Sequence, residues 1–134
     1  MVIAVYARPT KDNPSAYVEQ IYDCFKKEKV DLIIHKPYYN YICKEQGFKL
    51  PLQTFSTSEE LISKASYLIS LGGDGTILEA ITLVKRSGIP LLGVNTGRLG
   101  FLASVNKNDL HWALKELLDK KFTLDKRELI ELSG

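Results

Sequence analysis

Short apolar runs recur along this chain, separated by longer stretches in which apolar residues return with helical spacing. The runs at residues 2–7, 67–71 and 91–94 are almost entirely apolar, which is typical of strands buried on both faces of a parallel sheet. A shorter run at residues 32–34 predicts a further strand. The pattern therefore predicts a sheet whose central strands are covered on both sides.

Helix signals fall between the predicted strands. Asn13 precedes a proline and predicts the N-cap of a helix over residues 14–29. Thr57 and Glu60 have the spacing of a capping box, which predicts a helix over residues 58–64. Each of these helices would connect two strands of the sheet.

The second half of the chain continues the alternation. Helical spacing resumes at Gly75 and ends near Gly88. Asn106 and Asp109 are predicted to cap a last amphipathic helix. Residues 37–56 show no regular pattern, and the sequence assigns them no helix or strand. Strands alternating with helices predict an α/β fold, namely a Rossmann-like, open, mostly parallel sheet with helices on both faces.

Composition narrows the possible functions. The chain has 134 residues, of which 45% are hydrophobic and 25% charged, as is usual for a soluble globular domain. Its 18 basic and 16 acidic residues form no basic block, so we expect no nucleic-acid partner. We also expect no membrane partner, because no apolar run in the sequence is long enough to span a bilayer. Cys24 and Cys43 form neither a disulfide framework nor a metal motif, which favours reduced thiols in the cytoplasm.

A glycine-rich turn carries the clearest chemical signal. The sequence Gly-Gly-Asp-Gly-Thr at residues 72–76 joins a predicted strand to a predicted helix. Glycine lets a ligand approach the backbone closely, and the unpaired N–H groups of a helix N-terminus bind phosphate. A carboxylate beside phosphates needs a cation, such as the Mg²⁺ of a nucleoside triphosphate, or a hydroxyl whose proton it accepts. These features predict phosphate binding with Asp74 as the general base; the alternative is a tight turn in which Asp74 only caps the helix.

A second glycine-bearing turn follows the next predicted strand. Asn95 carries an amide that can read a ribose hydroxyl or a base edge, and Gly97 and Gly100 permit close approach. Phe101 can pack against a nucleobase ring or can lie in the core. Because parallel strands end at the same edge of a sheet, both turns are expected at one rim.

Taken together, the two turns resemble those of the NAD kinase family, whose members carry a GGDGT turn followed, after one helix and one strand, by an N-T-G-x-L-G-F-L segment. Both motifs are unbroken here, at residues 72–76 and 95–102, and the similarity extends from the first predicted strand to Arg127. The resemblance implies a phosphotransferase that moves a phosphoryl group from ATP or polyphosphate, with Mg²⁺ or another divalent cation, to the adenosine ribose 2′-hydroxyl of NAD.

The resemblance also assigns roles to individual residues. Asp74 would be the proton acceptor of the reaction that gives NADP. The residues that would contact the dinucleotide and the phosphates are Gly73, Asp74, Gly75, Thr76, Asn95 and Phe101. Two alternatives stay open. Diacylglycerol and sphingosine kinases share the first turn, although their Gly-Thr-x-Asn-Asp pattern is missing here, and a non-catalytic nucleotide-sensing domain would keep the same turn.

NAD kinases continue into a β-rich second domain that supplies an Asn-Glu or Asn-Asp pair. The pair Asn108-Asp109 has the right letters but is explained more simply by helix capping. We therefore expect a nucleotide-binding domain over residues 1–122, and over residues 123–134 the strand that leads into an absent second domain, so that the chain by itself is inactive. Residues 122–132 would be extended, with apolar side chains that nothing covers, and are expected to be disordered or paired with another copy in a homo-oligomer.

Overall fold

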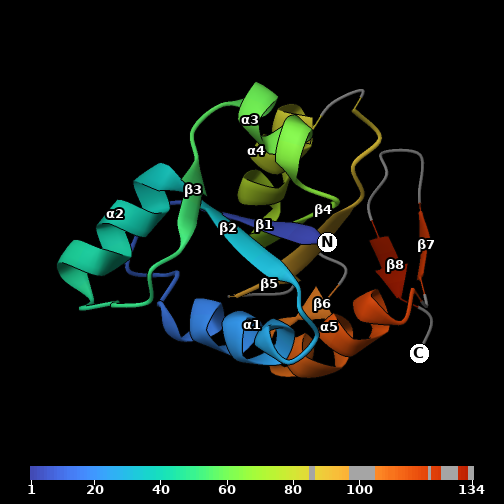
Figure 1. The fold of residues 1–134 in the computed structure, drawn as a ribbon, viewed down its shortest axis with the longest axis horizontal. Coiled ribbons are helices and arrows are strands. Elements are labelled where there is room, and N and C mark those ends of the chain that lie inside the picture. The colour runs from blue at the N-terminus through green and yellow to red at the C-terminus, as the bar shows by residue number, and fades with distance from the viewer. Residues whose placement is uncertain (85–86, 97–104, 121, 125–129, 133–134) are drawn as a thin grey trace.

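Parallel strands form the central sheet of this protein, described here from a computed structural model. The structure describes residues 1–84, 87–96, 105–120, 122–124 and 130–132. The strands of the sheet are β1 (Val2–Ala7), β2 (Asp31–His35), β3 (Gln53–Phe55), β4 (Tyr67–Gly72), β5 (Leu91–Asn95) and β6 (Val105–Asn106). Their order across the sheet is β3-β2-β1-β4-β5-β6 (Figure 1). Every pair of neighbours is parallel.

Helices cover both faces of this sheet (Figure 1). They are α1 (Ala16–Lys26), α2 (Lys36–Glu45), α3 (Ser58–Lys64), α4 (Asp74–Val84) and α5 (Leu110–Leu118), the last preceded by a short 3-10 turn. The helices α1, α2 and α5 pack against one set of strand residues, which includes Ile34, Ile69 and Val94. The helices α3 and α4 pack on the opposite face, against Ile33 and Leu68. The predicted Rossmann-like sheet with helices on both faces is therefore confirmed.

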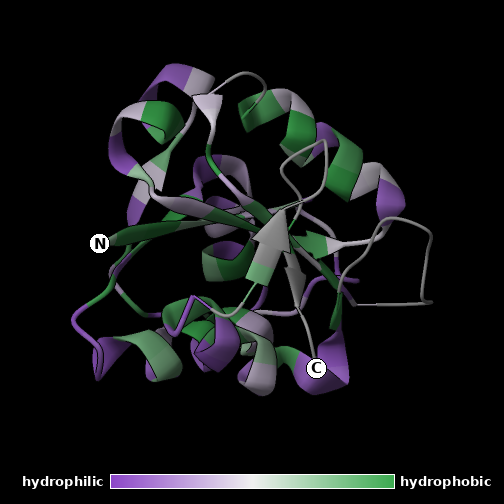
Figure 2. Cartoon of the chain, turned by 90° about the vertical axis from the view of Figure 1, so that its right-hand side faces the viewer, coloured by the Kyte–Doolittle hydropathy of each residue, from purple (hydrophilic) through white to green (hydrophobic). Residues whose placement is uncertain are grey.

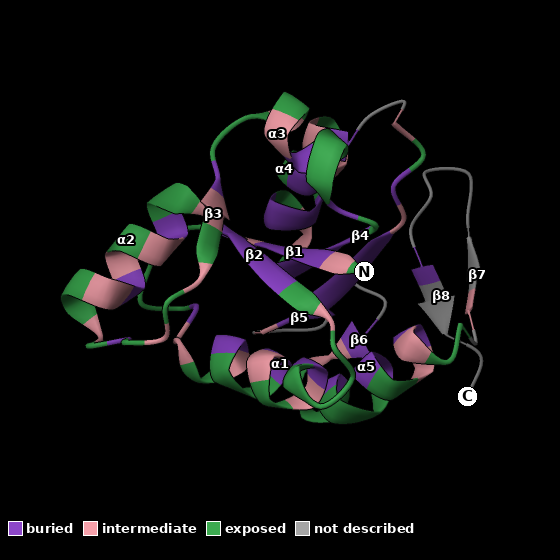
Figure 3. Cartoon of the chain, in the orientation of Figure 1, coloured by how far each residue is buried: buried purple, intermediate pink, exposed green. Residues whose placement is uncertain are grey.

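The central strands β4 and β5 are buried along their whole length (Figure 3). In β4, Ile69 and Leu71 lie on the α1 face, whereas Leu68 lies on the α4 face. Two covered faces explain why the apolar runs in the sequence show no alternation. Full burial of one such side chain is worth roughly 1.5–3 kcal/mol, so these strands contribute much of the stability of the sheet.

Helix α2 lies in a segment to which the sequence pattern assigned no helix or strand. Pro37 occupies the first turn, where its missing N–H interrupts no intrahelical bond. Tyr38 and Ile42, one helical turn apart, are fully buried, and the Tyr38 hydroxyl donates to the Asn13 carbonyl at 2.7 Å. The sequence pattern therefore missed α2, whose inner face carries Tyr38 and Ile42, and the strand β3 that follows it.

Helix α1 is shorter at both ends than the helix predicted over residues 14–29. Its N-cap is Ser15, whose backbone N–H donates to Gln46 Oε1 at 2.7 Å. The prediction that Asn13 caps this helix was wrong. The Asn13 side chain donates instead to the Arg8 carbonyl at 3.1 Å, so it serves the loop that precedes the helix.

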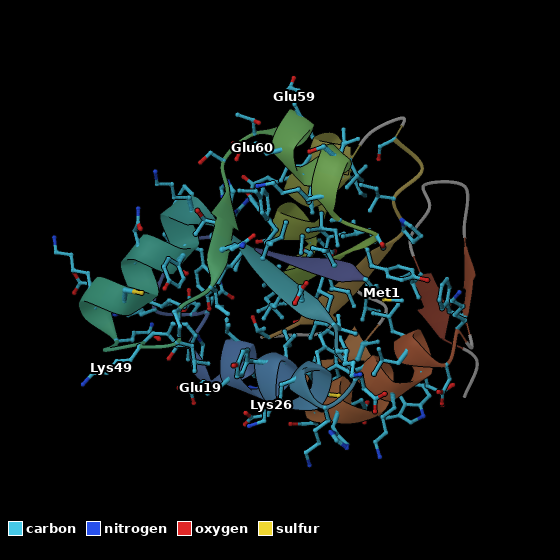
Figure 4. All side chains as sticks on the ribbon, viewed as in Figure 1. Met1, Glu19, Lys26, Lys49, Glu59 and Glu60 are labelled. Atoms are coloured by element: carbon cyan, nitrogen blue, oxygen red, sulfur yellow. The ribbon has the colours of Figure 1, made fainter. Side chains whose placement is uncertain are left out.

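Two other predicted caps are confirmed, and a third is not. At the start of α3, Thr57 Oγ1 accepts the backbone N–H of Glu60 at 3.2 Å (Figure 4 labels Glu60). Before α5, Asn106 Oδ1 accepts the backbone N–H of Asn108 at 2.9 Å. Asp109 occupies the N-cap position of α5 without a side-chain hydrogen bond to the helix, because the 3-10 turn Lys107–Asp109, with Asn106 as its N-cap, leads directly into α5.

The described residues near the C-terminus form an antiparallel pair of strands, β7 (Phe122–Leu124) and β8 (Ile130–Leu132). Ile130 is fully buried in the core on the α1 face. The ring of Phe122 meets Tyr67 edge to face, with the ring centroids 5.8 Å apart. The expectation of one uncovered extended segment, disordered or paired with another copy, was therefore wrong for these residues, because the two strands pair with each other and pack on the chain itself.

The helices are amphipathic, with apolar and polar residues on different sides (Figure 2). The charged side chains of Glu19, Lys26 and Lys49 point away from the protein (Figure 4), and all three residues are exposed. Among the helices that the structure describes, none combines the length and the apolar character needed to cross a membrane.

Replacing Tyr38 by Phe should lower the free energy of unfolding by about 1–3 kcal/mol, because the buried Asn13 carbonyl would lose this donor. Urea-induced unfolding of the complete gene product measures the change. Tyr22→Phe is the control, since within the described residues the half-buried Tyr22 hydroxyl has no hydrogen bond. Equal losses in the two variants would contradict the role given to the Tyr38 hydroxyl.

Candidate active site

The loop after β1 and the turn after β4 lie next to each other at the carboxyl edge of the sheet. β1 and β4 are parallel neighbours, with Ala7 paired with Leu71 at their ends. The chain then continues into α1 on one face and into α4 on the other. In open α/β sheets, ligands bind in the crevice that such a divergence leaves at the carboxyl ends of the strands. The topology therefore places the glycine turn at residues 72–76 where a ligand is expected.

The glycine turn adopts a backbone that favours glycine at its first position. Gly72 has a φ of +149°, and a Cβ added there would lie 2.6 Å from Thr76 Oγ1. At Gly73 a Cβ would meet nothing within 4 Å, so this residue leaves room for a ligand. Asp74 is half-buried and is the first residue of α4. The turn therefore brings a carboxylate and a helix N-terminus to the same edge of the sheet.

The end of β5 lies directly beside this turn. Asn95 pairs with Gly72 in the register of β4 and β5, and Thr96 donates its backbone N–H to the Gly72 carbonyl at 3.2 Å. The prediction that both turns share one rim is therefore confirmed for the start of the second turn. Phe101, which was predicted to line the site, lies outside the described residues, as does the rest of the segment 97–104.

Asn13 joins the loop after β1 to the end of β5. Its side chain is buried, with 4% of the residue exposed. Its Nδ2 donates to the Arg8 carbonyl at 3.1 Å and its Oδ1 accepts the Thr96 hydroxyl at 3.2 Å. Its backbone carbonyl accepts the Tyr38 hydroxyl. A buried amide satisfied at both ends holds its partners in one arrangement, so Asn13 fixes the relative positions of three segments.

A cleft of about 360 Å³ opens between these segments. Its described lining residues are Arg8, Thr10, Asp12, Asn13, Gly72, Gly73, Thr76, Asn95 and Thr96. Of the residues predicted from the sequence, Gly73, Thr76 and Asn95 line the cleft. Asp74 and Gly75 belong to the same turn but do not line the cleft itself. The loop after β1 was not predicted to line the site, although its position directly after a buried parallel strand was a signal for it.

Arg8 is held at this cleft by a carboxylate of α4. Its Nε lies 2.9 Å from Glu79 Oε1, and the Tyr6 hydroxyl donates to the same oxygen at 3.1 Å. The hydrogen bond from Arg8 lowers the pKa of Glu79. Burial, and after it the hydrogen bond to Glu79, raises the pKa of Tyr6 to about 12. The side chains of Arg8 and Glu79 are 48% and 45% exposed, so the ion pair orients the guanidinium more than it stabilises the fold.

A Gly72→Ala substitution should lower the free energy of unfolding by about 1–3 kcal/mol or more, because alanine is strained at this φ and its methyl group would collide with Thr76. Gly73→Ala is the matched control, since its Cβ would meet nothing within 4 Å. Thermal unfolding should separate the two variants. A Gly72→Ala protein as stable as the Gly73→Ala protein would show that the turn is built differently.

Arg8→Gln should raise the pKa of Glu79 toward the ordinary value of a glutamate, because the hydrogen bond that favours the carboxylate is lost. NMR titration of the side-chain carboxyl group measures this pKa. Lys26→Gln serves as the control, because Lys26 pairs with Asp23 on α1 and not with Glu79. In this variant the pKa of Glu79 should equal that of the wild type. If the pKa of Glu79 in the Arg8→Gln protein equals that of the wild type, Arg8 is not the cause of its lowered pKa.

The sequence matches the family model of the ATP-NAD kinase N-terminal domain over residues 4–122. An NAD kinase of Flavobacterium johnsoniae is 35% identical over 133 residues, which cover 99% of this chain and 45% of that protein. An NAD kinase of Flavobacterium psychrophilum is 36% identical over 132 residues, which cover 98% of this chain and 45% of that protein. The chain thus spans less than half the length of these curated relatives.

A solved structure has a similar fold. The crystal structure of yeast NADH kinase complexed with NADH superposes on 91% of this chain and 37% of its own, with a TM-score of 0.76 and 22% sequence identity. At this identity the likeness shows the fold, and it agrees with the open parallel sheet. The family match favours NAD kinases over the lipid kinases that share the glycine turn, because the model that matches residues 4–122 is that of the ATP-NAD kinase N-terminal domain. On these grounds, the chain belongs to the ATP-NAD kinase N-terminal domain family.

Proposed function

We propose that the complete gene product phosphorylates NAD at the 2′-hydroxyl of its adenosine ribose, giving NADP. The observation that carries the proposal is the position of Asp74. It is a half-buried carboxylate at the N-terminus of α4, beside the cleft where the connections after β1 and β4 diverge. Membership of the family, whose curated relatives are named NAD kinases, supports NAD as the acceptor.

Asp74 would act as the general base of this reaction. With ATP as the donor, the ribose oxygen forms a bond to the γ-phosphorus, and the bond from that phosphorus to the bridging oxygen of ADP breaks. The hydroxyl proton passes to the Asp74 carboxylate and from there to solvent. General-base catalysis of this kind contributes roughly 10²–10⁴ in rate.

The two turns at the rim would hold the substrates. Gly73 and Gly75 carry no side chain that would block phosphate oxygens from the N-terminus of α4. Thr76 and Asn95 line the cleft, where a hydroxyl and an amide can bind phosphate or ribose oxygens. By the family resemblance, Phe101 would pack against a ring of the dinucleotide.

A divalent cation such as Mg²⁺ would accompany ATP or polyphosphate. In the part of the chain that the structure describes, no group of three or more His, Cys, Asp or Glu side chains is placed to hold a metal ion. Asp12 lines the cleft and Asp74 lies beside it. Kinases commonly bind Mg²⁺ through one or two carboxylates together with the substrate phosphates, so these residues fit a cation that arrives with the donor. The cation would screen the phosphate charge, and proton transfer would remain with Asp74.

The chain would supply one side of the active site. We propose that residues 1–122 bind nucleotide and that residues 123–134 lead into a β-rich second domain. The proposal is supported by the length of the curated relatives, of which this chain covers only 45%. Catalysis would then require the complete gene product.

The free cysteines Cys24 and Cys43 support a reduced, cytoplasmic setting.

Asp74→Asn in the complete gene product should lower kcat for NADP formation by about 10²–10⁴, while the Kd for NAD changes little, because asparagine keeps the size of the side chain and loses its basicity. Coupled spectrophotometric assay and calorimetric titration with NAD measure the two quantities. Asp23→Asn, an exposed position on α1, should leave both unchanged. Turnover at the wild-type rate in the Asp74→Asn protein would defeat the assignment of the base.

A further inference from the structure

We propose that the guanidinium of Arg8, held by Glu79 beside the glycine turn, binds the phosphate chain of a substrate in the cleft. The proposal rests on the proposed function, because it takes the cleft to be the nucleotide site. It adds a binding residue from the loop after β1, a segment in which neither the sequence motifs nor the family resemblance assigned a role.

The guanidinium lies against the glycine turn. Its Nη2 is 3.0 Å, and its Nη1 3.6 Å, from the point where a Cβ on Gly75 would stand. Its Nε is bound to Glu79 at 2.9 Å. An arginine presents its N–H donors in a planar fork. With the Nε edge bound to Glu79 on α4, the Nη groups lie next to the turn at which a phosphate would bind.

The carboxylates around the cleft favour a positively charged side chain as the phosphate-binding group. Asp12 lines the cleft and Asp74 lies beside it, and both carboxylates repel a phosphate chain. Of the described residues that line the cleft, Arg8 is the one with a positive charge. A divalent cation bound to the donor moves with the substrate, whereas Arg8 is a charge that the chain itself keeps in place. Guanidinium and phosphate also match in geometry, since two parallel N–H···O bonds can form.

The backbone of Arg8 is fixed as well as its side chain. Its carbonyl accepts the backbone N–H of Thr10 at 2.8 Å and the Nδ2 of the buried Asn13 at 3.1 Å. Asn13 in turn accepts the hydroxyl of Thr96, which follows the end of β5. Lys11, three residues further along the same loop, is exposed and does not line the cleft. The loop after β1 therefore contains two cationic side chains, of which Arg8 is positioned to bind a ligand in the cleft and Lys11 is not.

The test compares Arg8→Gln with Lys11→Gln in the complete gene product, because each variant removes one positive charge from the same loop. The probe is inorganic tripolyphosphate with Mg²⁺, titrated calorimetrically. Loss of a charge-assisted contact should weaken binding about tenfold or more in Arg8→Gln, while Lys11→Gln should bind as the wild type does. Arg8→Lys, which keeps the charge but not the fork, should fall between the two.

Three results would overturn the proposal: a wild-type protein that binds no tripolyphosphate, an Arg8→Gln protein that binds it as tightly as the wild type, or an equal loss in Lys11→Gln. The KM values for ATP and for NAD in Arg8→Gln then identify the phosphate chain. A raised KM for ATP alone points to the donor, and a raised KM for NAD alone points to the pyrophosphate of the dinucleotide. If the wild type forms no NADP, the proposed function fails, and the tripolyphosphate titration still decides the role of Arg8.

Discussion

The parallel pairing of β1 with β4 is the constraint on which the rest of this structure depends. The two strands are neighbours in the middle of the sheet, but the chain leaves them toward opposite faces, into α1 and into α4. No helix can cover the edge where the two connections separate, so a crevice remains there. The glycine turn, the loop after β1 and the end of β5 meet at this crevice because the register of the sheet brings their strand ends together.

Hydrogen bonds at this edge of the sheet hold the neighbouring loops together as one site. Asn13 is the centre of these bonds, since it contacts the Arg8 carbonyl, the Thr96 hydroxyl and the Tyr38 hydroxyl. A buried amide costs stability unless both of its ends are bonded, so the arrangement of its partners is strongly specified. Helix α2 takes part in the site through Tyr38 without reaching the cleft.

The electrostatics of the rim combine opposing requirements. A general base must be an anion, and the substrates proposed for this cleft are anions too. Asp74 is the first residue of α4, where the backbone N–H groups of the helix favour negative charge. The Arg8 guanidinium lies beside Gly75 of the same turn and is oriented by Glu79. Arg8 lowers the pKa of Glu79 through their hydrogen bond, which favours the carboxylate form that holds the guanidinium.

The sequence by itself determined the central strands, the flanking helices other than α2 and the position of the glycine turn. Burial on both faces of the sheet produces an unbroken apolar run, and a positive φ favours glycine. Both features can therefore be predicted from residues that are close together in the sequence. Only the tertiary structure decided the roles of Arg8, Asn13 and Tyr38. Their partners are 71, 83 and 25 residues away along the chain, and a local pattern of polar and apolar residues carries no information about which distant side chain a folded sheet will place opposite.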